Sequence, residues 1–379
     1  MAPEIEYPGL PKWERAASAK EPPLIRLRTA AARWLDTQTG TALERDAVPV
    51  LALLRRFKPV LATPRFTLVL RNADVRDVLA DPDAFTVGLY SAKMEKILGG
   101  FALGVDDPSA HAASRAILDQ AFLPGDVEAL AGRTATLANE AVTHARGRPT
   151  FDIVGGLARP VLARTVSEHL GIPAPDPAQF AGWTHDIFRE VFLNPNDDQA
   201  VARRADAAHV ALRAALAPVV APQASEGTVL RRFQHAGLPP GAITGNLIAL
   251  AVAWIPNTVK SFTSAIAELL ARPDALAGAR DAARYGDDRQ LGGYIDEALR
   301  LRVPHAGVPR LCVRDREVGG TTIPAGTPVV AVTKSAMRDA PAVDAPRRFR
   351  PDRPSADYLN FGFGRHTCLG APVSSRQMA

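Results

Sequence analysis

The sequence predicts a mainly α-helical fold with small β-sheets, an α+β arrangement. Apolar residues recur at helical spacing through most of the chain, and proline and glycine separate these helical segments from one another. Only two short stretches have the alternation and composition of strands. Helices that outnumber two small β patches in this way indicate an α+β fold in which the α part dominates.

The expected helices follow one another along the first 270 residues. Alanine is abundant in them, which suits close packing of helix against helix. The predicted segments are Ala47 to Leu54, Ala73 to Ala80, His111 to Phe122, Asp126 to Ala145, Phe151 to Leu170, Pro177 to Phe192, Asp198 to Val220 and Ala242 to Leu270.

The expected strands lie in two places. One is the short run Thr67 to Leu70, and the other is the longer stretch Leu311 to Val332. Within the second, residues 318–330 predict two β runs joined by a turn at Pro324, Ala325 and Gly326.

Composition excludes several classes of protein. Of the 379 residues 47% are hydrophobic and 22% are charged, which excludes wholesale disorder. The net charge of +5 is spread along the chain without a dense basic run, so no nucleic-acid partner is expected. Only Cys312 and Cys368 are cysteines, which excludes a disulfide framework and a cysteine-based zinc site and suggests a reducing cytoplasm.

No segment suggests targeting to a membrane. The first 20 residues lack the apolar stretch of a signal peptide. The longest strongly apolar run, Leu247 to Ile255, ends at Pro256 and is far shorter than the roughly 20 residues that cross a bilayer. We therefore expect no membrane partner and a cytoplasmic location.

The sharpest motif surrounds Cys368, in the segment Phe361-Gly-Phe-Gly-Arg-His-Thr-Cys-Leu-Gly370. Three glycines around one cysteine indicate a tight loop that a large group can approach closely. A single thiolate held near backbone N–H groups and a basic residue is a candidate metal ligand or nucleophile. Heme iron is the metal centre that needs one cysteine and no second protein ligand on the same face.

This segment resembles the heme-binding loop of the cytochrome P-450 family, Phe-Gly-x-Gly-x-His-x-Cys-x-Gly, at every fixed position. The resemblance implies a fold of many helices and small β-sheets around heme b (iron protoporphyrin IX), with Cys368 as the iron ligand. It covers about residue 45 to the end, so we expect a lead segment, 1–44, and one domain, 45–379. Because only 11 residues follow Cys368, this domain is expected to lack the family's usual C-terminal hairpin.

Two further segments match the family in the expected order. Glu297 and Arg300 have the Glu-x-x-Arg spacing that places a carboxylate and a guanidinium on one helix face. The resemblance implies a structural ion-pair network on the proximal side of the heme, completed by Arg353 or Arg350.

Upstream, Asp107-Pro-Ser-Ala-His-Ala-Ala-Ser-Arg115 resembles the start of a family helix that faces the heme. The resemblance implies that a heme propionate is clamped by basic side chains. Guanidinium suits this task because its planar fork binds a carboxylate through two hydrogen bonds. The expected clamp comprises His111, Arg115, Arg310 and His366.

The helix expected to cross the distal face of the heme departs from the family pattern. Family members commonly carry an acid and an alcohol there that relay protons to bound oxygen. Counting back from Pro273 places Asn257 at the alcohol, Pro256 at the acid and Trp254 where a glycine normally makes room for oxygen. A slip of one residue would instead place Thr258 at the alcohol and Asn257 at the acid. Neither register offers a carboxylate, and Pro256 predicts a kink with an open carbonyl one turn earlier.

The resemblance implies a heme-thiolate monooxygenase. Its expected substrate is a hydrophobic small molecule, its oxidant dioxygen, and its electron donors ferredoxin and ferredoxin reductase. The altered distal helix leaves three alternatives open: a peroxide-using peroxygenase, a hydroperoxide isomerase or dehydratase, and a non-catalytic relative that binds heme or a partner.

Overall fold

The computed structural model describes residues 48–379, apart from residues 64, 99–103, 195–196 and 222–224. The expected lead segment, 1–44, lies outside the described residues. The chain forms two compact units. The first contains residues 48–89, 305–346 and 362–365, and the second contains residues 90–304, 347–361 and 366–379.

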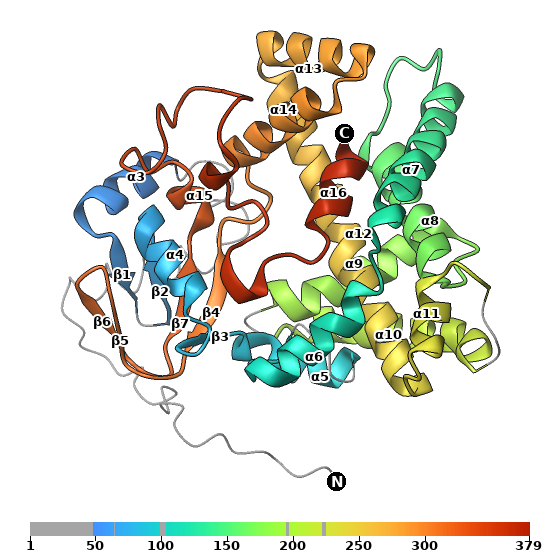
Figure 1. Ribbon diagram of the computed structural model, residues 1–379, viewed down its shortest axis with the longest axis horizontal. Helices are drawn as coiled ribbons and strands as arrows, with labels where there is room; N and C mark the ends of the chain where they lie inside the picture. Colours follow the sequence, from blue (N-terminus) through green and yellow to red (C-terminus); the bar gives the residue numbers. More distant parts are fainter. Residues whose placement is uncertain (1–47, 64, 99–103, 195–196, 222–224) are drawn as a thin grey trace. The chain divides into compact units, whose positions relative to one another are not determined.

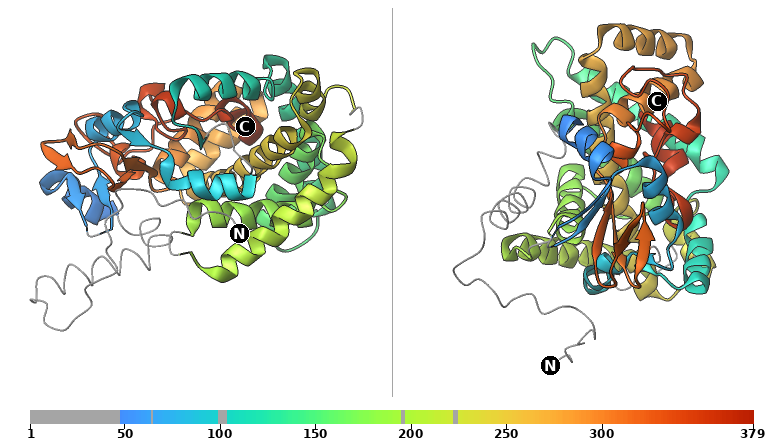
Figure 2. Two further views of the ribbon diagram at one scale, coloured as in Figure 1. Left: turned by 90° about the horizontal axis from the view of Figure 1, so that it is seen from below. Right: turned by 90° about the vertical axis from the view of Figure 1, so that its left-hand side faces the viewer.

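The first unit holds a five-stranded sheet in the order β1-β2-β7-β4-β3 and a two-stranded sheet, β5-β6. Strands β2 and β7 pair in parallel, and the other pairs are antiparallel. In Figure 2 the strands lie side by side, with α3 and α4 in blue beside them. The elements are α3 (Val48–Phe57), β1 (Val60–Ala62), β2 (Thr67–Val69), α4 (Asn72–Ala80), β3 (Phe85–Thr86), β4 (Val308–Cys312), β5 (Arg316–Val318), β6 (Thr321–Ile323), β7 (Pro328–Ala331) and α15 (Thr333–Ala336).

The β region after residue 308 is more divided than the sequence predicted. The tight hairpin joins β5 to β6 at Gly319 and Gly320, both of which have positive φ. Glycine is favoured there because such a two-residue turn needs left-handed backbone. The Pro324-Ala325-Gly326 turn instead leads from β6 to β7, which belong to different sheets.

The second unit is helical (Figure 1). Its elements are most of α5 (Gly88–Leu98), α6 (Pro108–Asp119), α7 (Pro124–His144), the π-helical turn η2 (Val154–Ala158), α8 (Arg159–Leu170), α9 (Pro177–Leu193), α10 (Gln199–Val220), α11 (Val229–His235), α12 (Pro240–Leu270), α13 (Pro273–Tyr285), α14 (Asp288–Leu301), the short 3₁₀ turn η3 (Ser355–Asp357) and α16 (Ala371–Met378). Another 3₁₀ turn, η4 (Gly364–His366), spans the boundary between the units. The expected helix 151–170 therefore begins as a π-helical turn.

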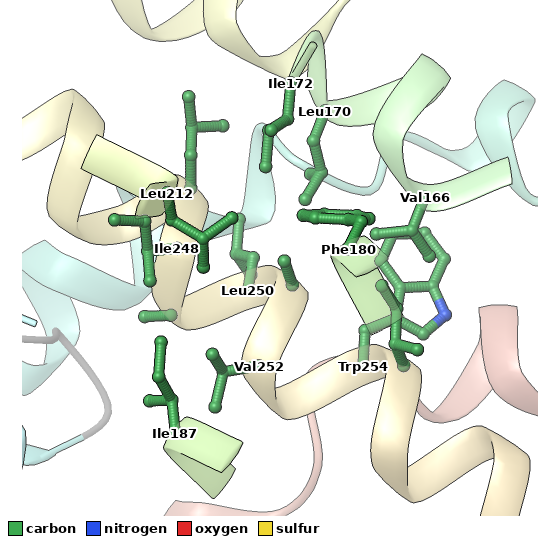
Figure 3. Packing of buried hydrophobic residues seen from close by; sticks show 14 of the residues in the cluster. Val166, Leu170, Ile172, Phe180, Ile187, Leu212, Ile248, Leu250, Val252 and Trp254 are labelled. Atoms are coloured by element: carbon green, nitrogen blue, oxygen red, sulfur yellow. The ribbon is translucent and has the colours of Figure 1, made fainter. Parts of the chain in front are cut away.

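The core of the second unit is built around α12. This helix packs against α8, α9, α10, α11, α13, α14 and α16. Figure 3 shows side chains of α8, α9 and α10 turned toward α12, among them Phe180, Ile187 and Leu212 opposite Ile248 and Leu250. These side chains are almost fully buried. Burial of each large apolar side chain contributes on the order of 2 kcal/mol, so α12 is held mainly by packing.

Among the described residues, α12 is also the helix long and apolar enough to cross a membrane. Its apolar window is 72% buried inside the protein. That burial is the situation of a core helix surrounded by other helices.

Candidate functional site

Cys368 lies in a loop between η4 and α16 whose shape depends on backbone contacts. The Cys368 N–H donates to the carbonyl of Phe361 at 3.0 Å, which closes the loop. Gly364 has a φ of +76°, and a Cβ there would collide with the carbonyl of Leu79. The glycine of the motif is thus required by both its dihedral angle and its surroundings.

The Cys368 sulfur meets opposing influences. The residue is exposed, yet the protein atoms around its sulfur desolvate it and raise the pKa of the thiol. The backbone N–H of Gly370, the charge of Arg115 and the backbone N–H of Ala371 oppose this rise in pKa. These donors and the positive charge stabilise the thiolate form, the form that ligates metals.

Helix α6 brings two of the predicted basic residues to this loop. Asp107 caps the helix by accepting the Ala110 N–H at 2.8 Å, and Pro108 occupies the first turn, where its missing N–H costs nothing. His111 is buried, and its ring lies edge-on to that of His366, with 4.8 Å between ring centroids. One turn later, Arg115 Nη1 donates to the carbonyl of Thr367 at 3.3 Å.

Four predicted residues are therefore gathered in the second unit: His111, Arg115, His366 and Cys368. Arg310, the fifth, belongs to the first unit. It is buried in β4, where Nη1 donates to the carbonyl of Pro309 at 2.9 Å. Its role toward a propionate stays a prediction of the sequence.

The predicted ion-pair network is fully buried in the second unit. Arg300 binds the two carboxylate oxygens of Glu297 through Nε and Nη2, each at 2.7 Å, and neither side chain has any solvent exposure. Arg353 Nε completes the network at 3.0 Å from Glu297 Oε1. Arg350 contributes only its backbone N–H to Glu297, while its guanidinium faces Asp352. Of the two candidates, Arg353 supplies the side chain.

The distal-helix candidates lie on two faces of α12. Ala253, Pro256, Asn257 and Lys260 are half-buried and form a stripe at helical spacing, here called the open stripe. Asn257 Nδ2 donates to the carbonyl of Ala253 at 2.7 Å. The helix continues through Pro256, which cannot supply the N–H that the Val252 carbonyl would accept.

Thr258 and Trp254 lie on the opposite, buried face. Thr258 Oγ1 is 3.4 Å from Ser374 Oγ on α16, and Trp254 Nε1 donates to Gln377 Oε1 at 2.8 Å. The Trp254 ring also packs edge-on against Phe122. The indole expected beside the oxygen site therefore belongs to the helix core.

Sequence reasoning missed the groups that support this arrangement. The backbone N–H groups of Gly370 and Ala371 carry no side-chain signal, and only the start of α16 shows that they reach the sulfur. Thr258 follows Trp254 by four residues, and this spacing alone indicates that the two share a face.

Comparison with known proteins followed from this geometry. A family model described as "Cytochrome P450" matches residues 291–379. Cytochrome P450-SU2 of Streptomyces griseolus is 31% identical over 320 residues, which are 81% of this chain and 76% of that protein. Erythromycin C-12 hydroxylase of Saccharopolyspora erythraea is 29% identical over 355 residues, 90% of this chain and 86% of that protein.

Solved structures agree with the sequence relatives. The crystal structure of CalO2 superimposes with a TM-score of 0.78 at 25% identity, covering 90% of this chain and 88% of that one. The likeness confirms the predicted fold class, mainly helical with small β-sheets.

Proposed function

Since this chain belongs to the cytochrome P450 family, whose members are monooxygenases with a heme-thiolate cofactor, we propose that Cys368 is its iron ligand and a hydrophobic small molecule its substrate. We further propose ferredoxin and ferredoxin reductase as electron donors and the cytoplasm as the compartment. The observation that carries the proposal is the thiol of Cys368 with two backbone N–H donors and the Arg115 charge directed at it.

The residues around Cys368 fit a heme. One exposed thiol in a glycine-bounded loop is a suitable axial ligand, and the basic group of His111, Arg115 and His366 suits a propionate. When bound, a thiolate-ligated heme supplies the oxygen chemistry, and the thiolate favours cleavage of the O–O bond. Arg115 would serve twice, by binding the propionate and by stabilising the thiolate through its charge.

The open stripe is the part of α12 that we propose faces substrate and oxidant. Asn257 is its polar side chain next to Pro256, whereas the Thr258 hydroxyl is turned toward Ser374. This placement favours the register in which Asn257 stands at the alcohol position and Pro256 at the acid position. An amide is not an acid at neutral pH, so proton delivery would depend on water or substrate held beside Asn257.

One observation favours a second candidate function, oxygenation driven by peroxide. Pro256 stands where a carboxylate usually relays protons, and a peroxide brings the protons and electrons that dioxygen would have to receive separately. Relatives also differ in substrate. Erythromycin C-12 hydroxylase acts on the molecule in its name, and we propose for this chain only the broader class of hydrophobic small molecules.

Heme ligation is tested by the spectrum of the reduced, CO-bound protein. We expect the Soret band of a thiolate-ligated heme in the wild type and its loss in Cys368→Ala. Cys312→Ala is the matched control, because Cys312 is the buried cysteine of β4 and should keep the band. A wild-type protein that binds no heme, or a Cys368→Ala variant that keeps the band, would refute the assignment.

The oxidant is tested by comparing product formation with ferredoxin, ferredoxin reductase and NAD(P)H against product formation with hydrogen peroxide. We expect Asn257→Ala to lower the product formed per NAD(P)H consumed, and Thr258→Val to change it little. Equal coupling in wild type and Asn257→Ala would contradict the role of the open stripe. Faster turnover with peroxide would favour the second candidate.

A further inference from the structure

A hydrogen-bonded path leads from α14 to the Cys368 loop. Asn360 Nδ2 donates to the backbone carbonyl of Asp296 at 3.2 Å, and the same amide hydrogen-bonds the Asp296 carboxyl group. Asn360 immediately precedes Phe361, whose carbonyl accepts the Cys368 N–H at 3.0 Å. A half-buried acid is thus joined to the backbone of the proposed iron ligand through one side chain and one peptide unit.

Helix α14 is a rigid base for this path. A Cβ at Gly293, one turn before Asp296, would collide with the carbonyl of Pro351, so the helix and the 350 segment touch through their backbones. Glu297, next to Asp296, binds the same segment through Arg353. Because α14 and the segment are fixed together, a change at the Asp296 side chain is passed to Asn360 rather than absorbed by movement of the helix.

Asp296 is a group that can change charge near neutral pH. Burial raises its pKa to about 6, and the hydrogen bond from Asn360 opposes part of that rise. In the described part of the chain, Asn360 Oδ1 is buried and accepts no hydrogen bond. A protonated Asp296 carboxyl would gain an O–H donor, and this amide oxygen is an acceptor beside it.

Other charged and titratable groups surround α14. Burial raises the pKa of Tyr358 well above its usual range, and the negative charges of Glu297 and Asp296 add to this rise. The remaining groups, on α14, on the 347–361 segment, on α12 and on α16, are Arg300, Arg353, Glu268 and Arg376. The pKa of Asp296 itself is governed first by desolvation and then by Asn360.

We propose that Asp296 is a positioning residue for Cys368. Through Asn360 and Phe361 it sets the hydrogen bond that the Cys368 N–H donates, and a proton taken up from solvent by the carboxylate resets that bond. The carboxylate accepts from Asn360 Nδ2, whereas the neutral acid donates to Asn360 Oδ1. This inference rests on Cys368 being the iron ligand only for its consequence, since the path itself belongs to the protein.

The amide signal of Cys368 tests the path directly. Labelling with ¹⁵N-cysteine gives two signals, because Cys312 and Cys368 are the only cysteines, and Cys312→Ala assigns them. In the full-length apo chain and in the diamagnetic ferrous–CO holoprotein, we expect the Cys368 amide shift to titrate with a midpoint near pH 6. The Cys312 signal on β4 is the internal control and should not follow this titration.

Two variants should move the titration in different ways. Asp296→Asn should abolish it, because the amide has no proton to gain. Asn360→Asp should raise its midpoint, because a second carboxyl beside Asp296 disfavours the doubly ionised pair. Asp352→Asn, at an exposed acid on the same segment, should leave the midpoint unchanged.

A Cys368 signal that does not titrate in the wild type, or that titrates identically in Asp296→Asn, would overturn the proposal. If Asp296→Asn does not fold, the midpoint in Asn360→Asp still decides. Failure of the chain to bind heme would count against the proposed function, whereas the apo chain would still report on the path. The two failures are therefore distinguishable.

Stability offers a second measurement with a defined sign. The folded-state pKa of Asp296 lies above its ordinary value, so its contribution to stability is complete below about pH 4 and is lost as the pH rises through about 6. Asp296→Asn should therefore melt at a higher temperature than wild type at about pH 8 and lose this advantage toward pH 4. An advantage independent of pH would contradict the buried, titrating acid.

Discussion

Cys368 shows how a single residue acquires its chemistry from backbone as well as from charge. Desolvation alone would hold the sulfur in its neutral thiol form, but Gly370 and Ala371 direct their N–H groups at it. Arg115 adds a positive charge from α6, a helix more than 200 positions earlier in the chain. The motif identifies the cysteine, while the surrounding atoms determine how readily it becomes a thiolate.

Glu297 is the residue whose loss should be most costly. Glu297→Gln would leave Arg300 and Arg353 with an uncompensated charge in a site with no solvent exposure, so we expect a loss of about 3–5 kcal/mol in the free energy of unfolding. Glu128→Gln removes the partner of Arg376 on the surface and should cost less than about 1 kcal/mol. Urea unfolding measures both, and equal losses would contradict the dominance of the buried network.

At the scale of elements, α12 separates what periodicity predicts from what it leaves open. The apolar run and Pro273 predicted a long helix ending near residue 270, and the structure has one helix, Pro240–Leu270. The sequence left two registers for the distal residues, because most of the helix is apolar on every side. The neighbouring α16 distinguishes the two faces by taking Trp254 and Thr258 against Gln377 and Ser374.

Pro256 should make α12 less stable than its length suggests. Pro256→Ala restores an N–H for the Val252 carbonyl, and we expect the free energy of unfolding to rise by about 1–3 kcal/mol. Pro240→Ala is the matched control, because Pro240 lies in the first turn, where the missing N–H is not needed. Thermal unfolding of both variants tests this, and a gain at Pro240 as large as at Pro256 would contradict it.

At the scale of the whole molecule, each unit is assembled from distant parts of the chain. In the first, β2 pairs with β7 across more than 250 residues. In the second, α7 and α12 meet α16 near the end of the chain through Gln377, which binds Thr134 and Trp254. Such long-range contacts make the terminal helix part of the same core as the central helices.

Heme should stabilise the folded chain as a whole. A ligand that binds the folded state and not the unfolded state raises stability by mass action, by about 2.7 kcal/mol at 100 times its Kd. We expect hemin to raise the melting temperature of the apo protein and Cys368→Ala to reduce this increase. Cys312→Ala should retain it, and an equal reduction in both variants would count against Cys368 as the ligand.

The sequence by itself determined the mainly helical class, most of the long helices, the Cys368 loop, and the Glu297–Arg300 pair, which lies three residues apart on one helix. These features are local, because periodicity, glycine and short spacing record them directly. The tertiary structure decided between Arg353 and Arg350, assigned Asn257 and Thr258 to different faces of α12, and joined Asp296 to the Cys368 loop through Asn360. It alone could do so, because each depends on atoms far apart in the chain that meet only when the helices pack.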